Sequence, residues 1–398
     1  MLEGKTILLG VTGSIAAYKA ANLASMLKKQ HADVHVVMTA NAAHFIHPIT
    51  FETLTGNKCL TDTFDRNFTF EVEHISLAKR ADFVLIAPAS ANVIGKIASG
   101  IADDMLTTTI MACTCEKAIS PAMNTNMYQN PIVQDNLKKL KQYGYHIIEP
   151  AVGRLACGDT GAGKMPPEDM LLETVLYAAA KEKDLKGMSV LVTAGATQEA
   201  IDPVRYLTNH STGKMGYALA RAAAMRGAKV TLISGKTALA APQFVKVIDV
   251  TSAEDMFQAV KREMNHQDII IKAAAVADYT PLQASEEKIK KSDGEMSLPL
   301  GRTTDILSYL GEHKRDGQFL CGFSMETEHV IGHSREKLKR KNADLICANS
   351  LRTEGAGFAG DTNILTLIDT ENELSLEKLS KEDAAHRVLD RILELRAK

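Results

Sequence analysis

The chain has 398 residues, enough for two domains with full cores, and its 45% hydrophobic and 24% charged residues are typical of a globular protein. A net charge of −2 excludes the basic field of a nucleic-acid-binding protein, and six scattered cysteines without a CxxC pair exclude a disulfide framework. No stretch approaches the roughly 20 apolar residues that span a bilayer, and residues 1–11 lack the features of a signal peptide, so we expect a cytoplasmic protein.

The two halves of the chain begin in the same way. LEGKTILL (2–9) and LKGMSVLV (185–192) share a Leu, a Gly, a small hydroxyl residue and an apolar run, and each run ends in small residues before a helical pattern. A doubly wound α/β domain opens in this way at a nucleotide site. The repeat therefore predicts two tandem doubly wound α/β domains with mostly parallel sheets, at residues 1–186 and 187–398.

The first half alternates apolar runs with helical patterns. Strands are expected at 5–12, 34–39 and 82–90, and further strands begin near 117 and 145. Helices are expected at 15–30, in one small-residue segment at 90–112, at 130–144 and at 168–183. Residues 151–167 are rich in glycine and have no period, which predicts a mobile loop or flap.

The second half repeats the alternation, which predicts a parallel sheet with sites at the carboxyl ends of its strands. A polar, lysine-rich loop is expected at 278–300, and a late hairpin is expected from NILTLID (363–369) and ELSLEKL (373–379). Strands are expected near 188–194, 229–234, 245–248, 268–273, 318–323 and 343–348. Helices are expected near 214–226, 253–266, 303–311, 329–341 and 380–396.

Small and hydroxyl residues follow two strands of the first half. Gly13 and Ser14, at the start of a helix, would offer backbone N–H groups and a hydroxyl to a phosphate, although an ordinary strand–helix turn has the same composition. Ser90 and Asn92 repeat this chemistry at a second strand end. Two such turns in one sheet favour a mononucleotide bound where the strand order reverses.

Three further residues of the first half are candidates for chemistry. His74 has a side chain suited to general-base catalysis, although a lone His is more often structural or exposed. Asn124 lies on a loop after a strand, where Asn is also a common turn residue. Cys157 lies in the glycine-rich segment, where packing does not explain a thiol, so a chemical role is favoured there over the inert role of most cysteines.

In the second half, STGK (211–214) resembles the end of a P-loop, but the GxxxxGK[ST] pattern is not satisfied. Asp278 follows small residues at the end of a strand. The lysines of KIKK (288–291) are either a solvated charge run, which is the more common case, or the cations that a triphosphate requires.

Together these motifs resemble one family over essentially the whole chain: HISLAK from His74, APASANVIGKIASGIADD (87–104), PAMNTNM (121–127), GRLACGDTGAGKM (153–165), DPVRYLTNHSTGKMG (202–216), and AAAVADY (273–279) with KIKK. The sequence is similar to the bacterial bifunctional coenzyme A biosynthesis proteins, which fuse phosphopantothenoylcysteine decarboxylase with phosphopantothenate–cysteine ligase. The resemblance implies a flavoprotein-like first domain with a flap loop, followed by a Rossmann-like second domain.

For the first domain, the resemblance implies bound FMN, which oxidises the substrate thiol to a thioaldehyde so that carbon dioxide leaves easily. It makes His74 the active-site base, Asn124 a contact of the substrate carboxylate and Cys157 the proton donor of the final reduction. The flavin-binding residues that it implies are Gly13, Ser14, Ile15, Thr39, Ala87, Pro88, Ala89 and Ser90.

For the second domain, the resemblance implies that CTP activates 4′-phosphopantothenate as an acyl-cytidylate, which cysteine then attacks. Asn209 would act on the acyl-cytidylate, Lys288 would serve its formation, and Mg²⁺ would neutralise the triphosphate. The CTP-binding residues that it implies are Ala273, Ala274, Ala275, Asp278, Lys288, Thr304, Asp305, Ile306, Leu307, Phe323, Lys337 and Lys341.

The chain departs from the family's usual sequence at RTTDIL (302–307), at GFSMET (322–327), and at Tyr128 and Lys164. The resemblance also implies a homo-oligomer with trimeric decarboxylase units and dimeric ligase units. Two alternatives are a decarboxylase of the flavin prenyltransferase or lantibiotic type with a degenerate ligase half, and a regulatory subunit that binds a phosphatase. Cys157, within its motif, argues against both alternatives.

Overall fold

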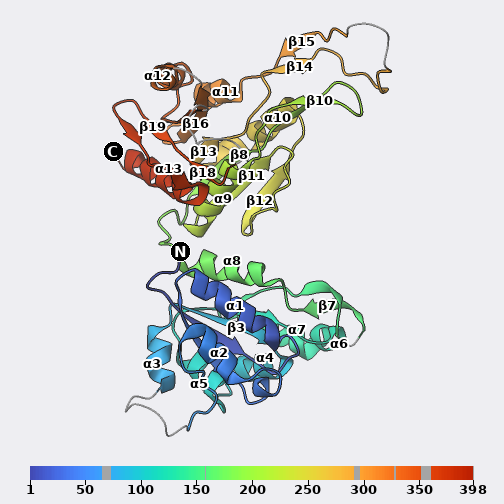
Figure 1. Cartoon of the computed structure of the whole chain (residues 1–398), viewed down its shortest axis with the longest axis vertical. Coiled ribbons are helices and arrows are strands. Elements are labelled where there is room, and N and C mark those ends of the chain that lie inside the picture. The colour runs from blue at the N-terminus through green and yellow to red at the C-terminus, as the bar shows by residue number, and fades with distance from the viewer. Residues whose placement is uncertain (65–72, 157, 291–295, 327–328, 351–359, 398) are drawn as a thin grey trace. The chain divides into compact units, whose positions relative to one another are not determined.

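The computed structural model describes residues 1–64, 73–156, 158–290, 296–326, 329–350 and 360–397 (Figure 1). Two compact units divide the chain, Met1–Glu182 and Lys183–Lys398. Among the described residues, no helix is both long enough and apolar enough to cross a membrane.

Unit 1 is built on a five-stranded parallel sheet in the order β2-β1-β3-β4-β5. Every residue of its two central strands is buried, as the continuous apolar runs in the sequence predict. The strand order reverses between β1 and β3, so their carboxyl ends form the crevice where such sheets bind ligands. The strands are β1 (Thr6–Val11), β2 (Asp33–Met38), β3 (Phe83–Ala89), β4 (Glu116–Pro121) and β5 (Tyr145–Ile147).

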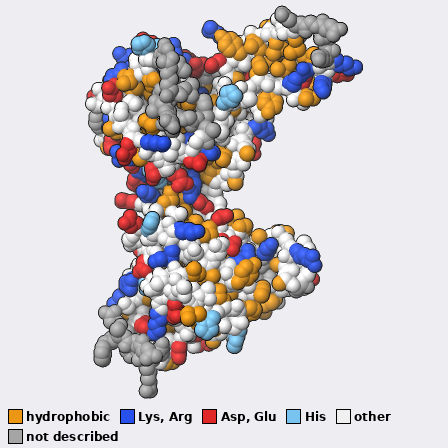
Figure 2. All heavy atoms as spheres, in the orientation of Figure 1, with side chains coloured by type: hydrophobic (Ala, Val, Ile, Leu, Met, Phe, Trp, Pro, Cys, Tyr) orange, Lys and Arg blue, Asp and Glu red, His pale blue; other side chains and the backbone are white. Residues whose placement is uncertain are grey.

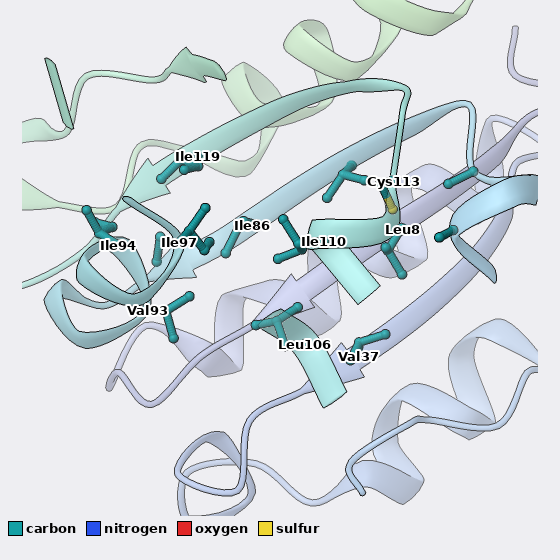
Figure 3. Close-up of a cluster of buried hydrophobic side chains, with 14 of the residues drawn as sticks. Leu8, Val37, Ile86, Val93, Ile94, Ile97, Leu106, Ile110, Cys113 and Ile119 are labelled. Carbon is teal, nitrogen blue, oxygen red and sulfur yellow. The ribbon is translucent and has the colours of Figure 1, made fainter. Parts of the chain in front are cut away.

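Helices cover both faces of this sheet. On one face, Leu8, Ile86 and Ile119 of the strands pack in one buried cluster with residues of α4 and α5, such as Ile94 and Ile110 (Figure 3). On the other face, α1 and α8 contact each other and strand β3 (Figure 1). The helices are α1 (Ala17–Lys29), α2 (Pro48–Thr55), α3 (Glu73–Arg80), α4 (Ala91–Ala98), α5 (Met105–Ala112), α6 (Thr125–Gln129), α7 (Pro131–Gln142) and α8 (Glu168–Ala179), with a 3₁₀ turn at Ala42–His44.

The structure corrects one expectation for unit 1 and adds detail to another. The segment 90–112 forms two helices rather than one, because α4 stops before Gly100, whose φ is +72°, and α5 restarts at a capping box between Asp104 and Thr107. The glycine-rich segment 151–167, expected to be a mobile loop or flap, contains a hairpin in which β6 (Ala151–Arg154) pairs antiparallel with β7 (Thr160–Lys164).

Unit 2 has an eight-stranded sheet in the order β12-β11-β8-β13-β16-β17-β19-β20. Its first six strands are parallel, and β19 and β20 form the predicted hairpin at one edge. The order reverses between β8 and β13, which places a second ligand-binding crevice there. The strands are β8 (Ser189–Ala194), β11 (Lys229–Ser234), β12 (Val245–Asp249), β13 (Ile269–Lys272), β16 (Phe319–Glu326), β17 (Leu345–Ser350), β19 (Thr366–Ile368) and β20 (Glu373–Ser375).

Helices again cover both faces of the sheet. Side chains of α10, α11 and α12 join strand residues such as Leu191 and Ile270 in one buried cluster, whereas α9 packs against β8, β11 and α13. The segment 278–300 is not wholly loop, because β14 (Tyr279–Pro281) pairs with β15 (Leu300–Arg302). The helices are α9 (Lys214–Met225), α10 (Ala253–Glu263), α11 (Ile306–His313), α12 (Val330–Arg340) and α13 (Lys381–Arg396), with a 3₁₀ turn at Met264–His266. Two short antiparallel pairs complete the unit, β9 (Gln198–Ala200) with β10 (Tyr206–Thr208) and β18 (Thr362–Asn363) with β21 (Leu379–Ser380).

Candidate active sites

Thr12 joins the two strand ends at the crevice of unit 1. Its hydroxyl donates to the carbonyl of Pro88 at 2.8 Å and accepts from the backbone N–H of Ser90 at 2.8 Å. The predicted turns at Gly13–Ser14 and Ala87–Ser90 are therefore tied side by side. Thr12 itself was not among the predicted residues, because a Thr at a strand end has no distinctive sequence pattern.

The turn after β1 suits an anion. No side chain caps the amino end of α1, although the N–H groups of Ala17 and Lys19 donate to the carbonyls of Ser14 and Ala16 at 2.9 and 3.0 Å. The positive end of the helix dipole still favours a phosphate at this turn. The Ser14 hydroxyl lies within the same turn, where it accepts from the N–H of Ala16 at 3.3 Å. Thr39 closes the neighbouring turn, since its N–H donates to Val11 and its hydroxyl accepts from Ala42.

A pocket of about 430 Å³, here called the hairpin pocket, adjoins this turn. It brings together the start of α1, the loop between β4 and α6, and the β6–β7 hairpin. Of the predicted residues, Ser14, Ile15 and Asn124 line it. The rest of its lining is Ala16, Tyr18, Lys19, Ala122, Met123, Arg154, Leu155, Ala156, Gly163, Lys164 and Met165.

Glycines let the hairpin lie directly on the loop that carries Asn124. The N–H of Met123 donates to the carbonyl of Gly163 at 3.0 Å, and Gly163 has a φ of +134°. The Asn124 amide donates to Asp159 at 3.1 Å while its oxygen caps α6 through Asn126. The predicted substrate contact is thus held by both the hairpin and the helix.

Two predicted catalytic residues do not join this pocket in the described structure. His74 lies in the first turn of α3, and Figure 1 shows α3 on the opposite side of unit 1 from β7 and α6. Cys157 lies outside the described residues. The roles assigned to both residues stay predictions.

Unit 2 has two adjoining pockets at the carboxyl ends of its strands, each of about 470 Å³. We call the first the lysine pocket; it is lined by Lys272, Val276, Asp278, Tyr279, residues 302–307, Phe323, Lys337 and Lys341. We call the second the loop pocket; it is lined by residues 209–216, 272–276, Asp278, residues 323–325, Lys337, Asn349, Asn363 and Lys381. Both pockets share Lys272, Val276, Asp278, Phe323 and Lys337, so they meet at these residues.

Every predicted CTP-binding residue except Lys288 lines one of these pockets. Lys337 donates to the carbonyl of Phe323 at 3.0 Å. Lys341 donates to the carboxylate of Asp305 at 2.6 Å and to the Ser308 hydroxyl at 2.8 Å. The Lys341 ammonium holds the pKa of Asp305 below its usual value against the opposing effect of burial.

The departure at Thr303 has a local role. Its hydroxyl donates to the carbonyl of Ala277 at 2.6 Å, and its N–H donates to the carbonyl of Asp278 at 3.0 Å. These bonds fasten the chain before α11 to the loop after β13, which are two walls of the lysine pocket.

Asn209 lies against the small residues after β13. Its amide nitrogen is 3.3 Å from the carbonyl oxygens of both Ala275 and Val276, and it lines the loop pocket. Lys288 is exposed and lines neither pocket, but the neighbouring Ile289 is anchored through its N–H to Asp202 and through its carbonyl to Arg205.

Lys272 is a site residue that the sequence prediction missed. It is the last residue of β13, it lines both pockets, and burial together with the nearby Lys337 lowers its pKa to about 8. A charged residue directly after three buried isoleucines was the available clue.

Comparison with known proteins assigns both units. Residues 1–179 match the family model described as Flavoprotein, and residues 185–395 match the DNA/pantothenate metabolism flavoprotein C-terminal domain. The chain is 47% identical to the coenzyme A biosynthesis bifunctional protein CoaBC of Bacillus subtilis (strain 168), across 99% of this chain and 98% of that protein. The chain belongs to the CoaBC family.

A second relative agrees with this membership. The CoaBC protein of Vibrio vulnificus (strain CMCP6) is 43% identical across 99% of this chain and 98% of its own length. A crystal structure of the C-terminal domain of a CoaBC protein is 40% identical, covers 54% of this chain and 98% of its own, and has a TM-score of 0.46. The full-length matches to the two CoaBC proteins and the Flavoprotein model make the chain a bifunctional enzyme of coenzyme A biosynthesis with a flavoprotein domain in its first half.

Proposed function

We propose that unit 2 joins 4′-phosphopantothenate to cysteine at the expense of CTP, and that unit 1 decarboxylates the product, 4′-phosphopantothenoylcysteine, to 4′-phosphopantetheine with FMN. The observation that carries the ligase assignment is the pair of pockets that meet at Lys272 and Lys337. A cation-rich nucleotide site that opens directly into a second site is what an adenylate-type or cytidylate-type ligation requires, because two substrates must meet at one phosphorus.

The ligation divides into two steps. A carboxylate oxygen of 4′-phosphopantothenate attacks the α-phosphorus of CTP, the bond to the β-phosphate breaks, and pyrophosphate leaves. The amine of cysteine then attacks the acyl carbon, the amide forms and CMP leaves. In this proposal the lysines of the shared wall neutralise the phosphates, and Asn209 orients the acyl-cytidylate by hydrogen bonding.

Mg²⁺ is proposed as a partner of the triphosphate. Within the described part of the chain, no three His, Cys, Asp or Glu residues cluster as a metal site. Mg²⁺ in nucleotide enzymes is often held by one or two carboxylates together with the substrate phosphates. Asp278, in the lysine pocket, is the carboxylate that fits this arrangement, because the carboxylate of Asp305 already accepts from Lys341 and from the N–H of Ser308.

Unit 1 fits FMN at its crevice. The positive end of the α1 dipole and the Ser14 hydroxyl suit the phosphate, and the strand order reverses at this point, as in other mononucleotide-binding sheets. Bound FMN would supply the two-electron oxidation and reduction at the substrate. The protein's own residues would then bind the substrate carboxylate at Asn124, exclude water with the β6–β7 hairpin, and exchange protons through His74 and Cys157.

The separation of His74 from the hairpin pocket supports a homo-oligomer. Apolar side chains surround the pocket, with Ile15 60%, Tyr18 61% and Val152 77% exposed, and Figure 2 shows apolar atoms gathered on this side of unit 1. Such an exposed patch is typical of a protein interface. We propose that a second copy covers it and brings its own His74 to the pocket, within the trimeric units that the family resemblance implies.

Mixing two inactive variants tests this shared site. His74→Asn and Asn124→Ala are each expected to abolish decarboxylation alone. Co-expressed, the two chains should regain a fraction of the wild-type rate, because some pockets would combine an intact His74 from one copy with an intact Asn124 from the other. A mixture as inactive as the separate variants would place both residues in one chain's site.

The ligase assignment is tested by nucleotide dependence. The purified protein should release pyrophosphate only when CTP and 4′-phosphopantothenate are both present, and cysteine should be consumed only after that release. Release of inorganic phosphate instead of pyrophosphate would contradict the acyl-cytidylate route. A purified protein without the absorbance of a flavin, even after incubation with FMN, would contradict the assignment of unit 1.

A further inference from the structure

Lys272 occupies the point where the two crevices of unit 2 meet. It ends β13, immediately beside β8 at the reversal of strand order, and the three residues before it are fully buried. Its ammonium group donates to the carbonyl of Ala274 at 2.9 Å, and its side chain lines both the lysine pocket and the loop pocket. No other cation of unit 2 that the structure describes lines both pockets, except Lys337.

Without a ligand, the surroundings of Lys272 stabilise its charged ammonium form poorly. Burial and, to a smaller extent, the nearby Lys337 on α12 together lower its pKa to about 8. Asp305, before α11, and Asp278, after β13, oppose this effect, but the carboxylate of Asp305 is already bound by Lys341 at 2.6 Å. Arg302 adds another positive charge to the same pocket. The site therefore has an excess of cations, which an anion would relieve.

A nucleotide that contacts predicted residues in both pockets must extend across the shared wall that contains Lys272. Thr304 and residues 305–307 line only the lysine pocket, whereas Ala273 and Ala275 line only the loop pocket. The wall between them consists of the shared residues, and Lys272 and Lys337 supply its cations. The phosphate chain is the part of a nucleoside triphosphate that seeks cations, so it is the part that this wall suits.

We propose that Lys272 binds the phosphate chain of the nucleotide and takes up a proton when the nucleotide binds. The inference rests on the proposed ligase function and adds a residue and a pH dependence to it. An anion favours the charged amine, so the pKa of Lys272 rises from about 8 in the complex. Below about pH 7 the amine is charged in both states, so its contribution to affinity is constant, whereas above pH 8 affinity falls by up to about tenfold per pH unit.

The test is calorimetric titration of the full-length protein with CTP and Mg²⁺ between pH 6.5 and 9.5, in buffers of different ionisation enthalpy that report proton uptake. A phosphate monoester titrates near pH 6, so protonation of CTP itself contributes little to the measured proton uptake above about pH 7.5. Lys272→Arg keeps the charge over the whole range, and Lys272→Met removes it. Lys229→Met is the matched control, because Lys229 is exposed and lies at the amino end of β11, at the edge of the sheet opposite to the pockets and separated from β13 by β8.

Wild-type protein is expected to take up part of a proton at pH 8.5 and to lose affinity as pH rises. Lys272→Arg should take up none, with affinity that stays flat, and Lys272→Met should bind about tenfold or more weakly at pH 7. Equal proton uptake by wild type and Lys272→Arg would overturn the proposal and direct attention to Lys381, whose pKa burial also lowers. Wild-type protein that fails to bind CTP at all would overturn the ligase function itself, whatever the variants do.

Discussion

Replacing Gly163 with Ala is expected to detach the β6–β7 hairpin from the decarboxylase site. A Cβ at this position would lie 2.3 Å from the carbonyl oxygen of Met123, and contacts below 3.0 Å essentially never occur for real Cβ atoms. The obstacle is backbone, so no side-chain rotation relieves it. The hydrogen bond from Met123 to Gly163 holds the hairpin against the loop of Asn124, and the methyl group would break it.

The cost has two parts. Gly163 has a φ of +134°, and holding an alanine in such a sparsely populated conformation costs about 1–3 kcal/mol. Overpacking against fixed backbone costs about 1–3 kcal/mol more. Even the lower sum of about 2 kcal/mol lowers the equilibrium constant for docking of the hairpin by roughly 30-fold. If docking stabilises the wild-type hairpin by about 2 kcal/mol or less, the undocked hairpin becomes the more populated state in the variant.

Gly153→Ala is the matched control within the same hairpin. The nearest atom to a Cβ there is the Lys164 Cδ at 4.0 Å, so the added methyl group has space. Decarboxylation of supplied 4′-phosphopantothenoylcysteine should fall at least tenfold in Gly163→Ala and stay near wild type in Gly153→Ala. CTP-dependent pyrophosphate release should be unchanged in both. Wild-type decarboxylation by Gly163→Ala would refute the role given to hairpin docking.

The other predictions separate the proposed steps. Asn209→Ala should slow amide formation at least about 100-fold, as loss of one oriented hydrogen bond does in other active sites. Decarboxylation of supplied 4′-phosphopantothenoylcysteine should continue. Equal loss of both activities would show that the two sites are not independent. Cys157→Ser should still release carbon dioxide but accumulate a product two mass units lighter than 4′-phosphopantetheine, because a hydroxyl is a far weaker acid than a thiol of pKa about 8.5. Normal product at a normal rate would make that thiol a bystander.

The strands and the two sheets were predicted well because the sequences of buried parallel strands are continuous apolar runs. It also placed Asn209 and the small residues after β13 at one site, which the contact of Asn209 with Ala275 confirms as a spatial arrangement. The catalytic roles of these residues are still predictions.

What the sequence could not predict depends on contacts distant in the chain. The hairpin at 151–164 was missed because its strands are held by backbone pairing and by glycines that fit against Met123, neither of which produces alternation of apolar residues. Lys272 was missed because its position between two pockets appears only when β8, β13 and α12 are assembled. In contrast, the break between α4 and α5 was readable, since Gly100 and Asp104 are a typical helix stop and start.

The most direct test of the account is one reaction with the purified chain, 4′-phosphopantothenate, cysteine, CTP, Mg²⁺ and FMN, followed by mass spectrometry. We predict 4′-phosphopantetheine with one pyrophosphate, one CMP and one carbon dioxide per molecule, and 4′-phosphopantothenoylcysteine as the transient intermediate. Accumulation of 4′-phosphopantothenoylcysteine without carbon dioxide, or conversion of supplied 4′-phosphopantothenoylcysteine without any CTP-dependent synthesis of it, would contradict the claim that this one chain carries both activities.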